Sequence, residues 1–397
     1  MKVAIIGSGI VGLTLAHTLT EKNIEVTIFE KEKDSLSHGT GRNSGVIHSG
    51  IYYQPNTLRS NLCIKGAKLM KKFIVDNNLY INNCGKLLLP KTKNDIETLN
   101  LLYERSKEVG VEAQKLNSLE EITKIEPNCN PLYNDALFIK DTAIADPKEV
   151  SNKLIEILKK RNVIIKYGFK VDEISSENTS INIKGNINKF DFIINSAGLH
   201  ADHLAKKANL ETDYTSLLFK GKYWKINFSD KNEIPNRLIY PVPNLDYPFL
   251  GIHTVYDKAG NLYLGPSNTP VFGREAYKPF YKFNLLEFLN LSYKFILKIF
   301  FNENNLRNLA ISESKNLFLF NVRKSSNVYF KHNPSNIELS SKVGIRSQIF
   351  DKKSKKLFND FVVIKQNNII HILNAISPAW TSSFAMADFI CEKYNFK

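Results

Sequence analysis

The chain has 397 residues, of which 43% are hydrophobic and 11% aromatic, so it is long enough for two or three domains with large cores. Its net charge is +15, but neither a stripe of arginine and aromatic residues nor zinc-finger spacing accompanies the charge, which argues against nucleic-acid binding. Contact of the basic surface with an anionic membrane stays open.

The first thirty residues contain the most informative pattern of the chain. An apolar run at residues 2–6 is typical of a buried parallel strand, and it is followed by a glycine-rich turn and a helical pattern. Residues 25–29 predict a second strand, and Glu30 stands at its end, 18 residues after Gly12. An acid at this place can accept both ribose hydroxyls of an adenosine. Strand, turn, helix, strand and acid together predict a dinucleotide site, in which we also expect Lys31.

The turn itself reads Gly7-Ser8-Gly9-Ile10-Val11-Gly12. Gly7 allows a tight turn, Gly9 lets a pyrophosphate approach the backbone, and Gly12 lets helix and strand pack closely. The N–H groups at the start of the helix then face the phosphates.

A glycine- and hydroxyl-rich stretch at residues 39–53 follows, and its apolar positions Val46, Ile47 and Ile51 indicate that it is buried. A buried irregular loop must satisfy its backbone polar groups, and a bound cofactor is a natural partner for them.

Hydrophobic periodicity and turn residues predict the remaining elements. Helices are expected at residues 57–77, 94–109, 119–125, 147–160, 284–301, 305–317 and 377–394, the last one capped by Ser377 with Pro378 in its first position. Strands are expected at residues 85–90, 136–139, 163–166, 170–175, 180–184, 190–195, 223–228, 238–242, 249–256, 262–264 and 370–374, and residues 327–341 resemble a loop.

This order predicts an α/β protein with a discontinuous, Rossmann-like nucleotide-binding domain and a second, sheet-rich substrate domain. The first is expected to comprise residues 1–80, 141–205 and 340–397, and the second residues 81–140 and 206–339. We see no internal repeat and no low-complexity linker, so the parts should form one compact body.

The helix expected at residues 284–301 is strongly apolar, with Lys294 and Lys298 as its only basic residues. Helices that are hydrophobic nearly all round are usually buried, so core is the first interpretation and a membrane-facing patch the alternative. No uncharged apolar run reaches the roughly eighteen residues of a membrane span. The cysteines Cys63, Cys84, Cys129 and Cys391 form no CxxC motif, so we expect reduced thiols, no metal site and a cytoplasmic protein without a signal peptide.

Several segments of the chain form recognisable motifs. The most specific is Gly41-Arg-Asn-Ser-Gly-Val-Ile-His-Ser-Gly-Ile-Tyr-Tyr53; others are Ile239-Tyr-Pro-Val-Pro243, Pro248-Phe-Leu-Gly-Ile-His253, Leu264-Gly-Pro266, Gly344-Ile-Arg-Ser-Gln348 and residues 374–383. Together they resemble the L-2-hydroxyglutarate dehydrogenase/oxidase family, which consists of FAD enzymes of the D-amino-acid-oxidase-like superfamily. The resemblance runs essentially from end to end. Ile376 and Trp380 depart from the family pattern, and a bulky Trp380 beside the flavin could narrow the pocket.

The resemblance implies FAD as cofactor, a small 2-hydroxy acid as substrate, and oxygen or a membrane quinone as electron acceptor. A peripheral contact with the inner face of the cell membrane would suit the quinone. The expected cofactor-binding residues beyond the first turn and strand are Arg42, Asn43, Ser44, Gly45, Val171, Ala197, Gly198, Thr381, Ser382 and Ser383. The last three would lie at a helix N-terminus that favours a reduced flavin anion.

Oxidation of a 2-hydroxy acid needs a base for the hydroxyl proton and an anchor for the carboxylate. His48, in the buried loop, is the candidate base. A structural hydrogen bond from His48 to flavin or backbone is an equally weighted alternative role. His253 is a second candidate, with a core position as the alternative, and Arg346 can grip a carboxylate with two parallel hydrogen bonds. Two other functions stay open. One is oxidation of an amino acid, a glycine-type amine or glycerol phosphate by the same superfamily, and the other is a non-catalytic flavin-binding assembly factor.

Overall fold

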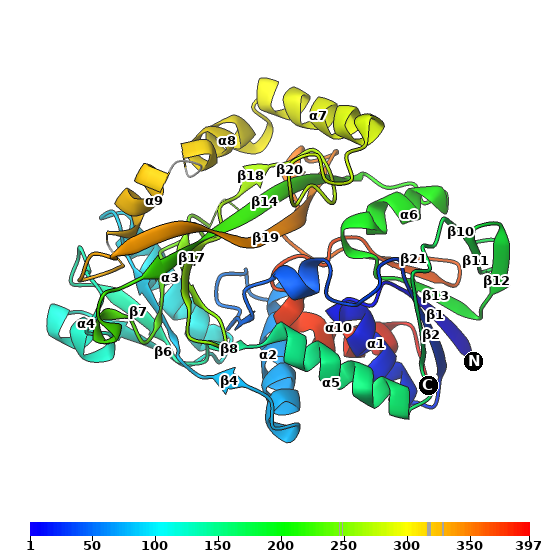
Figure 1. Cartoon of the computed structure of the whole chain (residues 1–397), viewed down its shortest axis with the longest axis horizontal. Helices are drawn as coiled ribbons and strands as arrows, with labels where there is room; N and C mark the ends of the chain where they lie inside the picture. Colours follow the sequence, from blue (N-terminus) through cyan, green and yellow to red (C-terminus); the bar gives the residue numbers. More distant parts are fainter. Residues whose placement is uncertain (246, 248, 316–318, 328) are drawn as a thin grey trace.

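A computed structural model describes residues 1–245, 247, 249–315, 319–327 and 329–397. A six-stranded sheet joins segments from the beginning, middle and end of the chain (Figure 1). Its strands, in spatial order, are β21 (Val363–Gln366), β22 (Ile369–Ile372), β13 (Phe192–Asn195), β1 (Lys2–Ile6), β2 (Glu25–Glu30) and β9 (Ile164–Tyr167). All neighbours pair in parallel except β21 with β22. This is the nucleotide-binding sheet that the first thirty residues predict.

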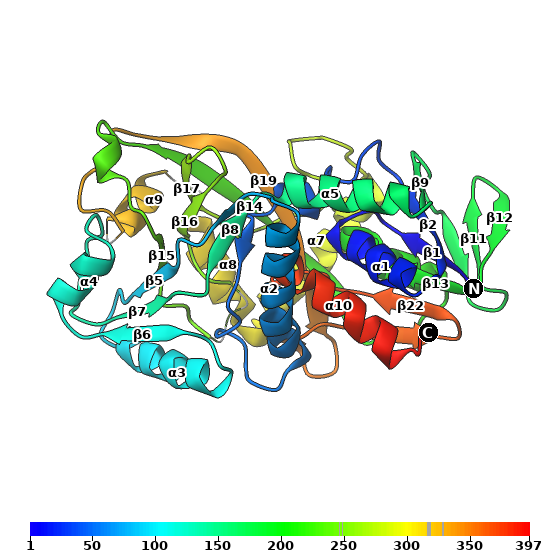
Figure 2. The same ribbon diagram turned by 90° about the horizontal axis from the view of Figure 1, so that it is seen from below.

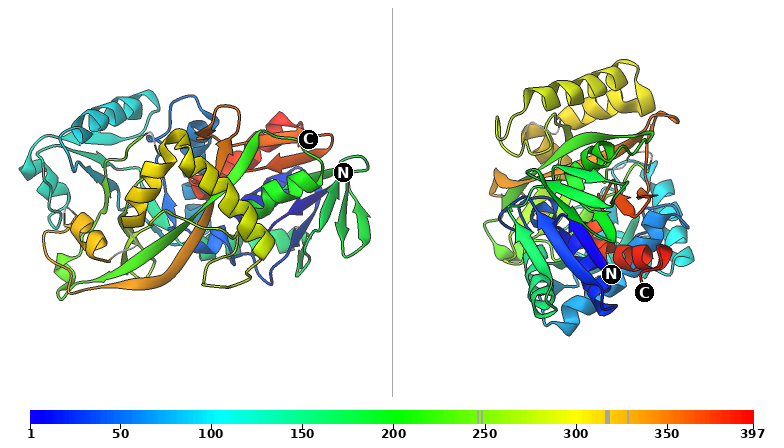
Figure 3. Two further views of the ribbon diagram at one scale, coloured as in Figure 1. Left: turned by 90° about the horizontal axis from the view of Figure 1, so that it is seen from above. Right: turned by 90° about the vertical axis from the view of Figure 1, so that its right-hand side faces the viewer.

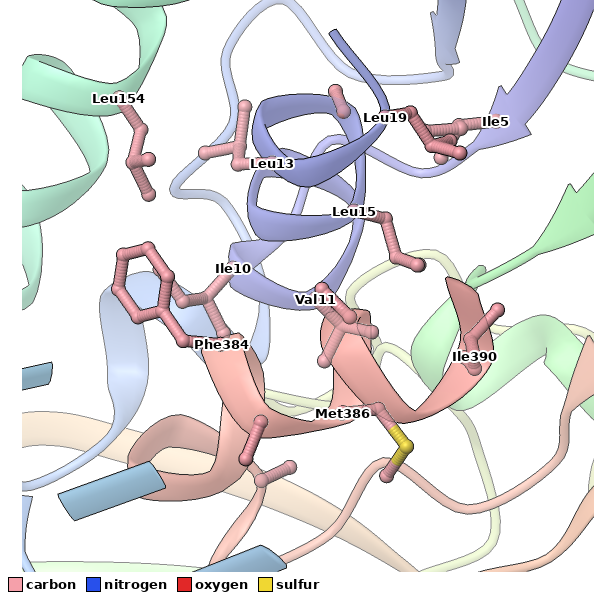
Figure 4. Packing of buried hydrophobic residues seen from close by; sticks show 14 of the residues in the cluster. Ile5, Ile10, Val11, Leu13, Leu15, Leu19, Leu154, Phe384, Met386 and Ile390 are labelled. Atoms are coloured by element: carbon pink, nitrogen blue, oxygen red, sulfur yellow. The ribbon is translucent and has the colours of Figure 1, made fainter. Parts of the chain in front are cut away.

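Helices pack on this sheet through one large apolar core. They are α1 (Ile10–Glu21), α2 (Leu58–Asp76), α5 (Pro147–Lys160) and α10 (Ala379–Lys393), with α6 (Ala201–Lys207) placed near β13 and β22. Figure 2 shows α1, α2, α5 and α10 gathered together, and Figure 4 shows Ile10 and Val11 of α1 next to α10, which carries Phe384 and Met386. Burying one such side chain fully is worth about 1.5–3 kcal/mol. The core therefore stabilises the packing of α1 on the sheet, and with it the turn between β1 and α1.

A second body of sheets lies beside the first. The largest sheet has the order β16 (His253–Tyr256), β17 (Leu262–Gly265), β14 (Tyr214–Asn227), β19 (Asn336–Asp351) and β20 (Lys356–Leu357), with β18 (Thr269–Pro270) paired to β14. A four-stranded sheet has the order β15 (Leu238–Pro241), β5 (Lys86–Leu89), β7 (Ala136–Ile139) and β6 (Ala113–Leu116). These two sheets enclose a second apolar core.

Smaller elements complete the fold. Two three-stranded sheets are formed by β10 (Glu173–Ser175), β11 (Ser180–Ile183) and β12 (Asn186–Lys189), and by β3 (Val46–Ile47), β8 (Ala143–Ala145) and β4 (Ile81–Asn82). The other helices are α3 (Asp95–Glu108), α4 (Leu119–Ile125), α7 (Leu285–Phe300), α8 (Leu306–Lys315) and α9 (Leu319–Ser326). In the described part of the chain, no helix is long and apolar enough to cross a membrane.

Four expectations need correction. The loop predicted at residues 327–341 is wrong from residue 336 onward, because β19 begins there and pairs along its length with β14. The domain boundary expected between residues 339 and 340 therefore falls inside one strand. Ser377 does not cap the last helix, since the cap position is Pro378 without a side-chain hydrogen bond. The helix predicted at residues 305–317 needs no such correction: it is α8, described from Leu306 to Lys315, and residues 316 and 317 lie outside the described residues.

The fourth correction concerns α7, which is not a core helix. Only Leu291 and Phe295 of this helix are buried, whereas Leu286 is 79% exposed and Phe300 70% exposed. Figures 1 and 3 show α7 and α8 on the outer surface, over the sheet that contains β14. The high hydrophobicity around the whole helix predicted burial on all sides, but only one side of α7 packs on the protein.

Candidate functional site

One long cavity of about 1250 Å³ runs from the turn after β1 to the sheet of β14 and β19. This is more than the roughly 300–1000 Å³ of a typical small-ligand pocket, so a dinucleotide and a second small molecule can share it. Of the residues predicted for the site, the cavity is lined by Gly7, Gly9, Ile10, Val11, Glu30, Lys31, Arg42, Asn43, Ser44, His48, Val171, Ala197, Gly198, His253 and Arg346. Ser8, Gly12, Gly45, Thr381, Ser382 and Ser383 lie behind its wall.

The turn between β1 and α1 requires its glycines. Gly7 has φ +100°, and a Cβ there would lie 2.7 Å from the carbonyl oxygen of Ser196. A Cβ on Gly12 would lie 2.0 Å from the carbonyl oxygen of Gly7, so only glycine lets the helix approach the strand. Helix α1 begins after Gly9 without a side-chain cap. The positive end of the helix thus faces the cavity, as phosphate binding requires.

Glu30 is 8% exposed and reaches the cavity from the end of β2. Its Oε2 accepts hydrogen bonds from the backbone N–H and the hydroxyl of Ser8, at 2.9 and 3.0 Å. Its Oε1 accepts from the backbone N–H of Glu32 at 2.9 Å. The carboxylate is therefore fixed in place, and Ser8 positions it without reaching the cavity.

A network of charges surrounds this end of the cavity. Glu32 and Glu275 are bridged by Lys31 and by Lys282, whose Nζ lies 3.0 Å from Glu32 and 2.6 Å from Glu275. Hydrogen bonds from the two lysines and His38 outweigh burial and lower the pKa of Glu32 to about 2. Glu32, His38 and Glu275 have the spacing of a metal site, but the lysine ammonium groups already bind both carboxylates. The network joins the loop after β2 to the segment before α7.

The loop after β2 is held by its own side chains. Arg42 donates to the carbonyl oxygens of Ser37 and of Val343 in β19, and it lies 3.9 Å from the ring centroid of Tyr277. Asn43 accepts from the backbone N–H of Gly45 at 2.7 Å. Gly45 has φ +75°, and a Cβ there would lie 2.3 Å from a carbonyl oxygen of β8, so this glycine is needed for packing.

The first turns of α10 position the His48 loop. The hydroxyl of Thr381 accepts from the backbone N–H of His48 at 3.1 Å and donates to the carbonyl of Val46. Thr381, Ser382 and Ser383 are fully buried, so the cavity is instead bounded here by the six preceding residues, 375–380. Trp380 lines it, and its indole nitrogen is buried without a hydrogen-bond partner.

The far end of the cavity brings together His48, His253, Tyr223 and Arg346, which come from four separate segments. The His253 ring stacks on Tyr240 with 3.8 Å between centroids, and its Nδ1 lies 2.7 Å from the carbonyl oxygen of Gly251. The Nδ1 of His48 is buried without a partner. In the described residues the Arg346 guanidinium has no hydrogen bond or ion pair; it lies 5.5 Å from the ring centroid of Phe249.

Burial controls the proton affinities at this end. It lowers the pKa of His48 well below the ordinary 6.5, and the charges of Lys86, His253, Arg59 and Arg346 lower it further. It lowers the pKa of His253 to about 3, although the hydrogen bond to the Gly251 carbonyl opposes this. Both imidazoles are therefore neutral near pH 7, and the arginine provides the positive charge.

The sequence interpretation missed two cations whose charges act on His48, of which only the second lines the cavity. Lys86, in β5, is completely buried with no hydrogen-bond partner for its ammonium, which lies 4.2 Å from the ring centroid of Tyr52 and 5.1 Å from that of Tyr240. Burial lowers its pKa to about 7. Arg59, in the first turn of α2, is 5% exposed and lines the cavity. The only sign of Lys86 in the sequence was a lysine inside the apolar run of residues 86–89, and no sign pointed to Arg59.

Comparison with known sequences places these features in a family. The sequence model of the FAD dependent oxidoreductase family matches residues 2–393. The chain is 32% identical over 399 residues to an L-2-hydroxyglutarate dehydrogenase of Indibacter alkaliphilus, and the match covers 98% of each chain. It is 30% identical over 419 residues to the mitochondrial human L-2-hydroxyglutarate dehydrogenase, covering 98% of this chain and 88% of that protein.

Solved structures share the fold. An L-alpha-glycerophosphate oxidase from Mycoplasma pneumoniae with FAD bound has a TM-score of 0.75 at 21% identity, covering 100% of this chain and 95% of that one. A glycine oxidase from Geobacillus kaustophilus has a TM-score of 0.69 at 14% identity, covering 98% and 93%.

Proposed function

The chain belongs to the FAD dependent oxidoreductase family, and on this basis we propose that it oxidises L-2-hydroxyglutarate to 2-oxoglutarate. The observation that carries the proposal is one continuous cavity with a dinucleotide site at one end and His48 and Arg346 at the other. Relatives at 30–32% identity that carry the name L-2-hydroxyglutarate dehydrogenase support this choice of substrate.

The residues of the cavity fit FAD. The N-terminus of α1 suits the pyrophosphate, although the Ile10 N–H already donates to the Thr40 hydroxyl at 2.9 Å, and Gly7 and Gly9 leave the backbone open to it. The Glu30 carboxylate is fixed where the adenosine ribose would present its hydroxyls. When bound, FAD supplies the acceptor for the hydride that leaves C2 of the substrate.

Replacing Glu30 by arginine is expected to weaken FAD binding at least tenfold, because a ribose acceptor is lost and a charge is placed in the wall. Glu25→Arg is the matched control, since Glu25 is exposed at the other end of the same strand. The FAD-to-protein absorbance ratio after purification and a fluorescence titration of the apoprotein measure the effect. Unchanged affinity in Glu30→Arg would contradict this role of Glu30.

The proposed reaction assigns one task to each polar residue of the far end. Arg346, whose guanidinium has no ion pair with the described residues, holds the C1 carboxylate and orients C2. His48, neutral because of burial, takes the hydroxyl proton as the hydride leaves. Thr381 orients the His48 backbone, and His253, held by Tyr240 and Gly251, forms part of the wall.

A spectral titration tests the proposal against its rivals. Under anaerobic conditions, L-2-hydroxyglutarate is expected to bleach the flavin and to be converted to 2-oxoglutarate. The 2-amino acids, glycine and glycerol 3-phosphate are expected to leave the flavin oxidised. Reduction by one of those compounds alone would indicate another reaction of the family. A flavin that no substrate reduces would indicate an assembly factor.

We further propose that α7 contacts an anionic membrane and that a membrane quinone accepts the electrons. The exposed face of α7 carries large apolar side chains, including Leu286, Tyr293 and Phe300, and the chain has a net charge of +15. Leu286, Asn290, Leu291 and Lys294 also line the cavity, so this surface adjoins the site.

The protein is expected to float with anionic vesicles at low salt and to be released as salt rises, because exposed charges are screened. Leu286→Glu combined with Phe300→Glu should abolish flotation, since both side chains are exposed and the fold does not need them. Ile187→Glu, on the distant β12 and 65% exposed, is the control that should still float. Absence of binding by the unaltered protein at low salt would end this proposal.

A further inference from the structure

Arg59 is fixed at the cavity wall by contacts on every side. Arg59 lies at the start of α2, which Thr57 caps. Its backbone N–H donates to the carboxylate of Asp360 at 2.6 Å. The guanidinium donates to the carbonyl oxygens of Asn359, at 3.0 Å, and Ser377, and it lies 4.4 Å from the ring centroid of Tyr53. These contacts hold the charged group in one orientation.

The charge of this guanidinium is not compensated. Both acceptors are neutral carbonyl oxygens, and no carboxylate of the described residues forms an ion pair with the Arg59 side chain. The Asp360 carboxylate instead accepts three backbone N–H groups. The Nε of Arg59 is buried without a partner. A buried donor and charge without an acceptor are costly, so such a group in a cavity wall indicates an anionic ligand.

Arg59 and Arg346 belong to the same end of the cavity. Burial lowers the pKa of Arg346, and the charge of Arg59 contributes to that lowering, while Glu313 and Tyr223 oppose it. The charge of Arg59 also lowers the pKa of His48. Arg105 lines the cavity as well, but its guanidinium donates to the carbonyl oxygen of Tyr52. Two guanidinium groups that line one cavity and have no carboxylate partner among the described residues call for a ligand with two negative groups.

We propose that Arg59 binds the distal carboxylate of the substrate while Arg346 binds the carboxylate beside the reacting carbon, so that the site selects 2-hydroxy dicarboxylates. This inference rests on the proposed function and adds a residue that recognises the length and charge of the substrate. A neutral chain end would leave the desolvated Arg59 without an acceptor, and discrimination of this kind is strong.

The test compares a dicarboxylate with a monocarboxylate of equal chain length. Binding of 2-oxoglutarate and of 2-oxopentanoate is measured by calorimetry on the FAD-loaded protein, and flavin reduction is measured with the corresponding L-2-hydroxy acids. The unaltered protein should bind 2-oxoglutarate about ten- to a hundredfold more tightly, the range of one charge-assisted hydrogen-bonding contact. Arg59→Gln should remove this preference by weakening only the dicarboxylate, and Arg59→Lys should retain part of it.

Arg105→Gln is the matched control and should leave the preference unchanged. Equal weakening of both ligands in Arg59→Gln, or no preference in the unaltered protein, would overturn the inference. The second of these needs no variant, so the proposal is testable even if Arg59→Gln does not fold. A protein that prefers the dicarboxylate keto acid but is reduced by no 2-hydroxy acid would refute the proposed reaction and leave the assignment of Arg59 standing.

Discussion

Replacing His48 by alanine is expected to slow flavin reduction by L-2-hydroxyglutarate by roughly 10²- to 10⁴-fold, the usual contribution of a positioned base. Substrate affinity should change little, since a base acts mainly in the transition state. Burial holds the pKa of His48 well below 6.5, so the unaltered protein should show no loss of rate as the pH falls through 6.5. Anaerobic stopped-flow absorbance across this pH range measures both effects.

Arg346→Lys is the comparison variant in the same experiment. It keeps a positive charge but loses the planar fork, so both affinity and rate should fall, by about tenfold to over a hundredfold together. An unaffected rate in His48→Ala would assign that histidine a purely structural role. Equal behaviour of Arg346→Lys and the unaltered protein would remove the carboxylate anchor.

Replacing Lys86 by methionine is expected to stabilise the protein below pH 7. Lys86 has an ordinary pKa of 10.5 and a pKa of about 7 in the folded protein, because it is buried. At about 1.4 kcal/mol per pH unit, this difference corresponds to roughly 5 kcal/mol. The folded state binds fewer protons than the unfolded state between these values, so the cost is fully present below pH 7 and disappears as the pH rises toward 10.5.

Lys86→Met should therefore raise the free energy of unfolding by a few kcal/mol at pH 6 and remove its rise between pH 7 and 10. Chemical denaturation at several pH values measures this. Lys107→Met is the control, because Lys107 also lies 4.2 Å from a tyrosine ring centroid but its side chain is 54% exposed. Similar results for the two variants would show that burial of Lys86 carries no such cost.

A buried lysine whose charge acts on the candidate base is typical of a functional site, where stability is given up for chemistry. The charge of Lys86 lowers the pKa of His48. Loss of this charge should therefore raise the proton affinity of His48.

The nucleotide-binding sheet could be predicted because its evidence is local. The strand of residues 2–6, the glycines and Glu30 follow each other within thirty residues, and each has a steric or hydrogen-bonding reason. The strand β19 could not be predicted so well, since polar residues such as Ser340 and Lys342 alternate on its less buried face and resemble a loop.

The far end of the cavity was only partly predictable. His48 and Arg346 were found through motifs, whereas Arg59 and Lys86 are single cations in an ordinary amphipathic helix and an apolar strand. Their importance depends on which partners they lack, and that is decided by residues distant in the sequence. For α7 the composition is visible in the sequence but the neighbouring elements are not, so exposure of the helix could not be distinguished from burial.

The proposed function is the oxidation of L-2-hydroxyglutarate with FAD bound in this cavity. It is tested most directly by adding L-2-hydroxyglutarate to the purified protein without oxygen and following the visible absorbance of the flavin. The expected result is complete bleaching, with one equivalent of 2-oxoglutarate formed for each flavin reduced. A flavin that stays oxidised with L-2-hydroxyglutarate but is bleached by glycerol 3-phosphate or a 2-amino acid would contradict the claim.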